Sequence, residues 1–336
     1  MSSSIFSYLP FLGHTVRITQ VCRMFLSLAL LLIVPITSTL AAGTAEVTRS
    51  GSNYIVRVDG TQVYSGTNYT DALIQAAGTG ERIMNIRVGG TITRTIRLRQ
   101  QSTLNYFPTS ERIVLGNIAG PGFYAYKSSG IVFNGLRLGG NAYYGIRLSS
   151  CGGSSFNNLN MDFGGNPVAV GLRVDNEGSA RVSGLTIRNS RVANIQAGGD
   201  RQGIETYGVD YYDIDGVTAY NIGGCGLLIN NGNNGRIGSV YGDRCGNGTT
   251  YAALRFANNC NGATVNYADA KNSARGLFIL NSTNIQVNRV LISNCSVDSI
   301  WIQNGSNNDV LAGNVYGRAP VITNSPGSMI SVVYTP

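Results

Sequence analysis

Histidine is almost missing from this sequence. The one histidine among the 336 residues is His14, which lies in an N-terminal segment with the features of an export signal. A chain that begins after this segment has no imidazole, which excludes a Ser-His-Asp triad and histidine-ligated metals. Lysine is also rare, since only Lys127 and Lys271 occur. No two cysteines stand in CxxC spacing, so a zinc site of the usual kind is not expected.

Residues 1–42 have the pattern of a signal peptide. An apolar run from Met24 to Leu40 follows Arg17 and Arg23 and ends in small residues. Pro35 and the polar residues after it leave the apolar run short of the ~20 residues that span a bilayer. We therefore predict a secreted, extracellular protein with no stable membrane anchor, and we take residues 43–336 as the mature chain.

The mature chain is moderately basic, and its cations are nearly all arginines. It has 23 Lys and Arg against 17 Asp and Glu, a net charge of +6, and 21 of the 23 cations are arginines. Arginine offers a planar, bidentate partner for carboxylate, sulfate or phosphate. In an exported protein this favours an acidic polysaccharide over nucleic acid as the partner. The alternative is that the arginines only keep the protein surface soluble, and a net charge of +6 fits this alternative almost as well.

Cysteines and glycosylation sequons fit an exported protein. Five cysteines remain after the leader, and an odd number leaves at least one thiol free even in an oxidising compartment. They are Cys151, Cys225, Cys245, Cys260 and Cys295. Sequons that permit N-glycosylation in a eukaryotic secretory pathway stand at Asn68, Asn247, Asn281, Asn294 and Asn304.

A short strand pattern recurs along the chain. A small residue, an aliphatic residue, any residue and a second aliphatic residue follow one another seven times, at intervals of 26, 32, 23, 27, 23 and 23 residues. The seven motifs are Gly145–Leu148, Gly171–Val174, Gly203–Thr206, Gly226–Ile229, Ala253–Phe256, Gly276–Ile279 and Ser299–Ile302. Repeats that cannot bury a face alone must stack, and we therefore predict a solenoid.

Asparagine marks the turn after these strands. It stands two residues past the motif in five of the seven coils, at Asn176, Asn231, Asn258, Asn281 and Asn304. We expect a left-handed turn there and a ladder of bonded side-chain amides. A second strand follows each turn, as in Arg236–Val240. The pattern predicts an all-β, right-handed, single-stranded parallel β-helix. The sequence lacks the fixed leucine frame of a leucine-rich repeat and the Ca²⁺-binding nonapeptide GGxGxDxUx, so neither of these repeat folds is expected.

One helix is expected before the coils. Tyr69–Gly78 is amphipathic, with Thr70 as its N-cap, and would cover the open apolar end of the solenoid. We divide the mature chain into an N-terminal cap with irregular first coils (residues 43–130) and regular coils with the C-terminal end (residues 131–336).

The motif also predicts which side chains face outward. Its second and fourth residues point into the core, so the first and third face out. The first is always small, which predicts a shallow trough. The third residues form a column with neighbours about 4.8 Å apart: Arg147, Arg173, Glu205, Leu228, Arg255, Phe278 and Trp301. The next outward column is Ser149, Asp175, Tyr207, Asn230, Ala257, Leu280 and Gln303.

These columns predict a groove for a linear polysaccharide that lies along the axis. Aromatic faces stack on sugar rings, and arginine forks bind uronate carboxylates. The substrate-binding candidates are Arg147, Arg201, Tyr207, Asn230, Phe278 and Trp301. The alternative is an ordinary sheet surface, with the two C-terminal aromatic residues under a closing loop.

Coil length, asparagine turns and strand order from Ile131 to Val333 resemble the pectin-lyase-like superfamily, which includes pectate, pectin, alginate and chondroitin lyases and polygalacturonase-type hydrolases. Polygalacturonases carry an NTDGFDI strand, a DDCxAIN strand and then GHGxSIGS. The nearest stretch here is GGDRQGIETYG (Gly198–Gly208), with Glu205 at the place of an acid. Gly223 and Gly224 replace the aspartate pair, and the histidine is missing. The polygalacturonase catalytic motifs are therefore not retained.

The resemblance implies β-elimination as the leading mechanism. Lyases of this fold use arginine or lysine to remove the C5 proton and a cation, often Ca²⁺, on the uronate carboxylate. Arg255 and Arg173 would be base and clamp, and Glu205 and Asp175 would orient them or bind Ca²⁺. No residue is assigned to a fixed metal site, and the need for Ca²⁺ stays open. A deprotonated arginine is a severe demand at neutral pH.

Two other functions stay open. Inverting hydrolysis needs two carboxyls about 6.5–9.5 Å apart across a water. Glu205 and Asp175 are expected about 8 Å apart from strand geometry. Asp200 is a further acid, because the 32-residue interval before Gly203 places it on the flank of the groove. The third function is a non-catalytic β-helix that binds polysaccharide or adheres. In each case we expect a monomer.

Overall fold

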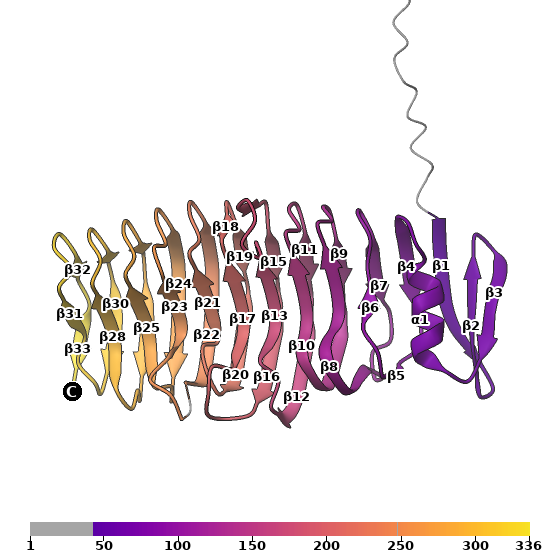
Figure 1. Cartoon of the computed structure of the whole chain (residues 1–336). Helices are drawn as coiled ribbons and strands as arrows, with labels where there is room; N and C mark the ends of the chain where they lie inside the picture. The colour runs from indigo at the N-terminus through magenta and orange to yellow at the C-terminus, as the bar shows by residue number, and fades with distance from the viewer. Residues whose placement is uncertain (1–42, 247) are drawn as a thin grey trace, which may run out of the picture. The chain divides into compact units, whose positions relative to one another are not determined.

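The chain folds into a stack of short parallel strands. The structure is a computed structural model that describes residues 43–246 and 248–336; the predicted signal peptide lies outside them. In this part the chain is an all-β, right-handed parallel β-helix of about eleven turns, as predicted. The coils follow one another from indigo to yellow in Figure 1. No helix in the described ranges is long and apolar enough to cross a membrane.

Each regular coil contributes strands to three parallel sheets. The first sheet contains β6 (Ile96–Arg97), β8 (Ile113–Tyr126), β10 (Arg137–Ser149), β13 (Val170–Asp175), β17 (Gln202–Tyr207), β21 (Leu227–Asn230), β23 (Ala252–Ala257), β25 (Arg275–Leu280), β28 (Asp298–Gln303) and β31 (Val321–Thr323). The second contains β4 (Arg82–Ile86), β7 (Thr103–Tyr106), β9 (Val132–Asn134), β11 (Ser155–Asn157), β15 (Thr186–Arg188), β19 (Asp213–Asp215), β26 (Gln286–Val287), β29 (Asp309–Val310) and β32 (Met329–Ile330).

The third sheet contains β5 (Gly90–Ile92), β12 (Asn160–Asn166), β16 (Arg191–Ile195), β20 (Val217–Ile222), β27 (Val290–Ser293), β30 (Gly313–Tyr316) and β33 (Val333–Thr335). The long strands β22 (Arg236–Cys245) and β24 (Thr264–Lys271) run through the second and third sheets, and β8 and β10 run through the third and first. A small separate pair is formed by β14 (Val182–Ser183) and β18 (Val209–Asp210).

An antiparallel sheet and one helix precede the coils. The sheet contains β1 (Gly43–Ser50), β2 (Asn53–Val58) and β3 (Thr61–Gly66), and α1 (Tyr69–Ala77) packs against it and against the first coil strands. The helix lies in the predicted segment, but the prediction of Thr70 as its N-cap is wrong. The Asn68 side chain caps it by accepting a hydrogen bond from the Asp71 amide at 3.2 Å. Thr70 is buried, and its hydroxyl accepts from the Thr93 amide at 2.9 Å.

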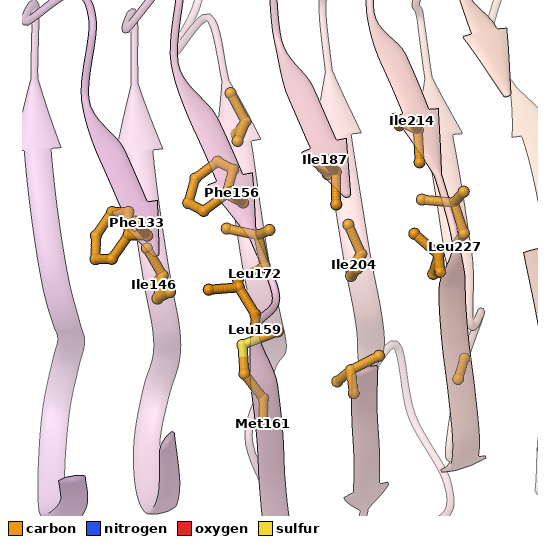
Figure 2. Close-up of a cluster of buried hydrophobic side chains, with 14 of the residues drawn as sticks. Phe133, Ile146, Phe156, Leu159, Met161, Leu172, Ile187, Ile204, Ile214 and Leu227 are labelled. Carbon is orange, nitrogen blue, oxygen red and sulfur yellow. The ribbon is translucent and has the colours of Figure 1, made fainter. Parts of the chain in front are cut away.

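Aliphatic and aromatic side chains fill the interior between the three sheets. Figure 2 shows Phe133 and Phe156 in neighbouring coils, with Ile146 and Leu172 from the first sheet beside them and Ile204 in the next coil. The Phe133 and Phe156 rings stack with their centroids 5.3 Å apart. All five side chains are fully buried. This core holds the first-sheet strands in register, so that their outward side chains line up along the axis.

The predicted asparagine ladder is only partly correct. Asn231, Asn258, Asn281 and Asn304 adopt left-handed backbone, with φ of 53°, 58°, 47° and 52°. Among the described residues, however, their side chains do not bond to one another in succession. The ladder of amides forms in the second sheet instead, where Asn105 donates to Asn85 at 3.0 Å, Asn134 to Asn105 at 2.8 Å and Asn157 to Asn134 at 2.9 Å. Those four residues are register partners in adjacent strands, which brings their amides face to face.

The predicted trough of small residues is also wrong. A Cβ at Gly203 would come within 2.6 Å of the Gly226 carbonyl oxygen and 2.8 Å of the Val192 side chain. A Cβ at Gly226 would come within 2.8 Å of the Ala219 side chain. The first motif position is therefore small because the first sheet packs closely against the third at that corner, and it is not open to a ligand.

Candidate functional site

A pocket of about 320 Å³ lies on the outer face of the first sheet, over β13, β17, β21 and β23. It is polar, with Leu228 and Ala257 as apolar parts of its wall. We call it the Glu205 pocket. Its lining residues are Tyr143, Tyr144, Ala169, Val170, Arg173, Asp200, Gln202, Glu205, Leu228, Asn230, Tyr251, Arg255, Ala257 and Asn258.

Strand register brings the central side chains together. Arg173 is the register partner of Glu205, Glu205 of Leu228 and Leu228 of Arg255. This is the column expected from the repeat, and Phe278 and Trp301 continue it. Glu205 and Arg255 stand two strands apart, which is about 10 Å along the axis. A sugar chain along the axis would pass both.

A chain of arginines and carboxylates forms the N-terminal side of the pocket. Arg173 donates from Nη1 to Glu205 Oε2 at 2.5 Å and from Nε to Asp175 Oδ2 at 2.9 Å. Arg147 donates from Nε to the same Asp175 oxygen at 2.9 Å and from Nη2 to Oδ1 at 3.3 Å. Asn230 donates from Nδ2 to Glu205 Oε1 at 3.3 Å. Glu205 is therefore held from two sides, and both oxygens of Asp175 accept hydrogen bonds from arginine.

The two carboxyls of this network differ in pKa. Burial raises the pKa of Glu205 above its ordinary value, and the charge of Arg173 and the Asn230 hydrogen bond only partly offset this. Burial would also raise the pKa of Asp175, but the hydrogen bonds and charges of Arg147 and Arg173 outweigh it and lower that pKa. Glu205 thus keeps a proton to higher pH than an ordinary glutamate, whereas Asp175 stays ionised.

The other side of the pocket is built around Arg255. Its guanidinium lies 4.4 Å from the centroid of the Tyr251 ring and 4.9 Å from that of Phe278. Its Nε is buried without a hydrogen-bond partner, and no carboxylate in the described ranges forms an ion pair with it. A hydrogen bond with Asp200 raises the pKa of Tyr251, with burial as the next cause. Tyr251 therefore contacts both Asp200 and Arg255 in the lining of the pocket.

Five of the predicted residues line the pocket: Arg173, Asp200, Glu205, Asn230 and Arg255. The other six do not. Arg147 and Asp175 stand behind Arg173 and bond to each other, and the Asp175 side chain is only 1% exposed. Arg201 folds back and donates from Nη1 to the Gly198 carbonyl at 2.6 Å.

The predicted aromatic residues lie outside the lining as well. Phe278 is 5% exposed, and its ring stacks on Trp301 with the centroids 5.0 Å apart. The Arg275 guanidinium lies 4.4 Å from the Trp301 ring centroid. These contacts leave little of the Phe278 face for a sugar. Tyr207 is exposed but lies beyond the pocket wall.

Several lining residues were missed from the sequence. Tyr143 and Tyr144 lie within β10, while Gln202 begins β17 and Tyr251 directly precedes β23. Tyr251 had a usable signal, because it stands four residues before Arg255 at the start of a strand whose third motif position was already predicted to face out. The two tyrosines from β10 had none, since they reach the pocket from the neighbouring coil.

The cysteines and acids form no metal site in the described residues. The five cysteines are free thiols and buried, and burial raises the pKa of Cys225 to about 11. In residues 43–246 and 248–336, no three histidine, cysteine, aspartate or glutamate side chains gather where they could hold a metal ion together.

No family model matches the chain, and no curated protein does. Among solved structures, tailspike protein 2 of an Escherichia coli O157:H7 bacteriophage is similar, with a TM-score of 0.52 and 12% identity over 85% of this chain and 45% of the tailspike. Its enzymatically active domain gives a TM-score of 0.51 and 12% identity, over 85% of this chain and 50% of the domain. These two likenesses show the fold alone, a parallel β-helix.

The tailspike chains are much longer than this chain. The chain spans about half the length of the tailspike chains that it matches. PfbA, a surface adhesin of Streptococcus pneumoniae, aligns with a TM-score of 0.46 and 12% identity, over 79% of this chain and 86% of the adhesin.

Proposed function

We propose that this protein hydrolyses a polysaccharide in the Glu205 pocket. The observation that carries the proposal is a carboxyl with a raised pKa, Glu205, in the same pocket as a second carboxylate, Asp200. Inverting glycosidases need such a pair, with a protonated acid on the leaving oxygen and a carboxylate that activates water. The similar tailspike domain is described as enzymatically active, which accords with a working site on this fold.

Each group has a role in this mechanism. Glu205, held by Arg173 and Asn230, donates its proton to the glycosidic oxygen as the bond to the anomeric carbon breaks. Asp200, which lines the same pocket, takes a proton from the water that attacks the anomeric carbon. Asp175 is removed from the catalytic pair proposed from the sequence, because it is buried behind Arg173 and touches only the network. It positions Arg173.

β-Elimination, the leading expectation from the sequence, becomes the second candidate. Burial would lower the pKa of Arg173, but Glu205 and Asp175 outweigh it and raise that pKa, which makes Arg173 a poorer base. Arg255 rests on two aromatic faces, which stabilise its cation. Elimination stays a candidate because Arg255, without a carboxylate partner, is suited to neutralise a uronate carboxylate.

The lack of a carboxylate partner for Arg255 among the described residues also supports an acidic, uronate-containing substrate. A bound carboxylate would supply the anion that the guanidinium lacks among the described residues. Tyr143, Tyr144 and Tyr251 offer rings for the sugar faces beside it. With the leader predicted in residues 1–42, we place the reaction outside the cell.

Product analysis tests this proposal. Purified protein is incubated with polygalacturonate, alginate and rhamnogalacturonan, and both reducing ends and the ultraviolet absorbance of unsaturated uronate are followed. Hydrolysis predicts new reducing ends without that absorbance. Absorbance that rises together with the reducing ends would establish elimination instead. Retention of the protein on the polymers without any product would leave only a binding function.

A further inference from the structure

A second hollow of about 530 Å³ lies on the outer face of the third sheet, over β20, β22, β24, β27 and β30. It shares no residue with the Glu205 pocket and plays no part in the proposed hydrolysis. We call it the tyrosine groove. Its lining includes three tyrosines and three charged residues: Tyr220, Tyr241, Tyr316, Asp243, Asp269 and Lys271.

Strand register explains the groove. Tyr220, Asp243, Lys271, Ser293 and Tyr316 are successive register partners and form one outward column. Thr218, Tyr241, Asp269 and Leu291 form the other. The residues between the columns point inward and include Ala219 and Gly242. Five adjacent strands span about 19 Å along the axis. The groove is therefore long and straight and has a repeating wall.

Its surface combines open rings with hydrogen-bonding groups. Tyr241 and Tyr316 are each 42% exposed, and Leu291 is 36% exposed. The Tyr241 ring is supported edge-on by Tyr267, with the centroids 5.9 Å apart, which fixes its orientation. Rings that offer a free face and a polar edge suit the face of a pyranose, whose hydroxyls bond at the rim.

The charges of the groove select against an anionic chain. In the lining, Asp243 and Asp269 carry two negative charges against the single positive charge of Lys271, and Arg244 lies beside the lining, where it donates to the Tyr220 hydroxyl at 3.0 Å. The Lys271 ammonium lies 3.9 Å from an Asp243 oxygen, so its charge is already turned toward that carboxylate. The Glu205 pocket, by contrast, has two arginines in its lining. Carboxylates accept hydrogen bonds from sugar hydroxyls and repel uronates.

We propose that the tyrosine groove binds a neutral polysaccharide along the solenoid axis, with Tyr241 and Tyr316 against sugar faces and Asp243 and Asp269 accepting from hydroxyls. This site lies on a different sheet from the Glu205 pocket. It holds the protein on a neutral glycan and leaves the pocket free to act on its own substrate.

Affinity gel electrophoresis tests the proposal. The full chain is run through gels that contain hydroxyethylcellulose, dextran, galactomannan or xyloglucan, and polygalacturonate serves as the anionic comparison. At least one neutral polymer should retard the protein. Tyr241→Ala and Tyr316→Ala should each weaken that retardation by up to about tenfold in apparent Kd. Tyr126→Ala, which removes a tyrosine of similar exposure (44%) outside the groove, is the matched control and should not.

Catalysis separates this proposal from the proposed hydrolysis. Activity on short soluble oligosaccharides should be the same in Tyr241→Ala and the wild type, because the groove shares no residue with the Glu205 pocket. Failure of all four neutral polymers to retard the protein would overturn the inference. Equal retardation of Tyr241→Ala and the wild type would overturn it too. So would a Tyr241→Ala variant that loses its binding to polygalacturonate and keeps its binding to every neutral polymer.

Discussion

Replacement of Glu205 by glutamine should abolish most turnover and leave the fold intact. Glutamine keeps the shape of the side chain but cannot release a proton to the leaving oxygen. Loss of a general acid lowers kcat by about 10²–10⁴-fold. The change also affects stability, because the amide can accept only one of the bonds now made by Arg173 at 2.5 Å and Asn230 at 3.3 Å. We expect a loss of about 1–3 kcal/mol in the free energy of unfolding.

The assay is the release of reducing ends at saturating substrate, with circular dichroism to show that the variant is folded. Glu46→Gln is the matched control, since Glu46 is an exposed residue of β1 whose side chain pairs with Arg87 at 2.6 Å. It should keep the wild-type kcat. An undiminished kcat in folded Glu205→Gln, or a raised KM with unchanged kcat, would refute the role of Glu205 as the acid, because the latter signals lost ground-state binding.

Three further results follow from the structure. Asp175→Asn should destabilise the protein by about 3 kcal/mol in urea unfolding at neutral pH, because two arginines lose a buried anion. Since the pKa of Asp175 is lowered in the folded state, this difference in stability from the wild type should shrink as the pH falls through that pKa. Arg173→Gln removes a charge that lowers the pKa of Glu205, so the alkaline limb of the kcat–pH profile should move to higher pH, and an unmoved limb would contradict the assignment. Phe156→Ala should lower the free energy of unfolding by about 3–5 kcal/mol, against a much smaller loss for Phe107→Ala, which is 49% exposed.

The repeat in the sequence was enough to predict the fold and the outward column. Every register pair from Arg147 to Trp301 stands as the motif spacing required. Strand alternation has a period of two and the core is apolar throughout, so a small–aliphatic–x–aliphatic motif leaves only one arrangement in which neighbouring coils can stack. Coil intervals from 23 to 32 residues did not disturb it, because the extra residues enter the loops.

The site was predicted less well, because side-chain contacts between coils decide it. Arg173 was expected to bind the substrate as a clamp, but its guanidinium donates hydrogen bonds to Glu205 and Asp175. The aromatic pair of Phe278 and Trp301 was expected as a platform, but the two rings cover each other. Neither contact can be predicted from the residues that flank it in the sequence. Spacing gives the strand and the face, whereas the direction of a long side chain depends on its neighbours one coil away.

Turnover in water labelled with heavy oxygen tests the central claim most directly. Hydrolysis transfers an oxygen of water to the new reducing end, whereas elimination breaks the bond without adding water. Purified protein is incubated with the polymer that it degrades, and the products are analysed at once by mass spectrometry. If the Glu205 pocket is hydrolytic, each new reducing end gains the heavy isotope, and folded Glu205→Gln yields almost none. Products that lack the label and carry a double bond would contradict the account.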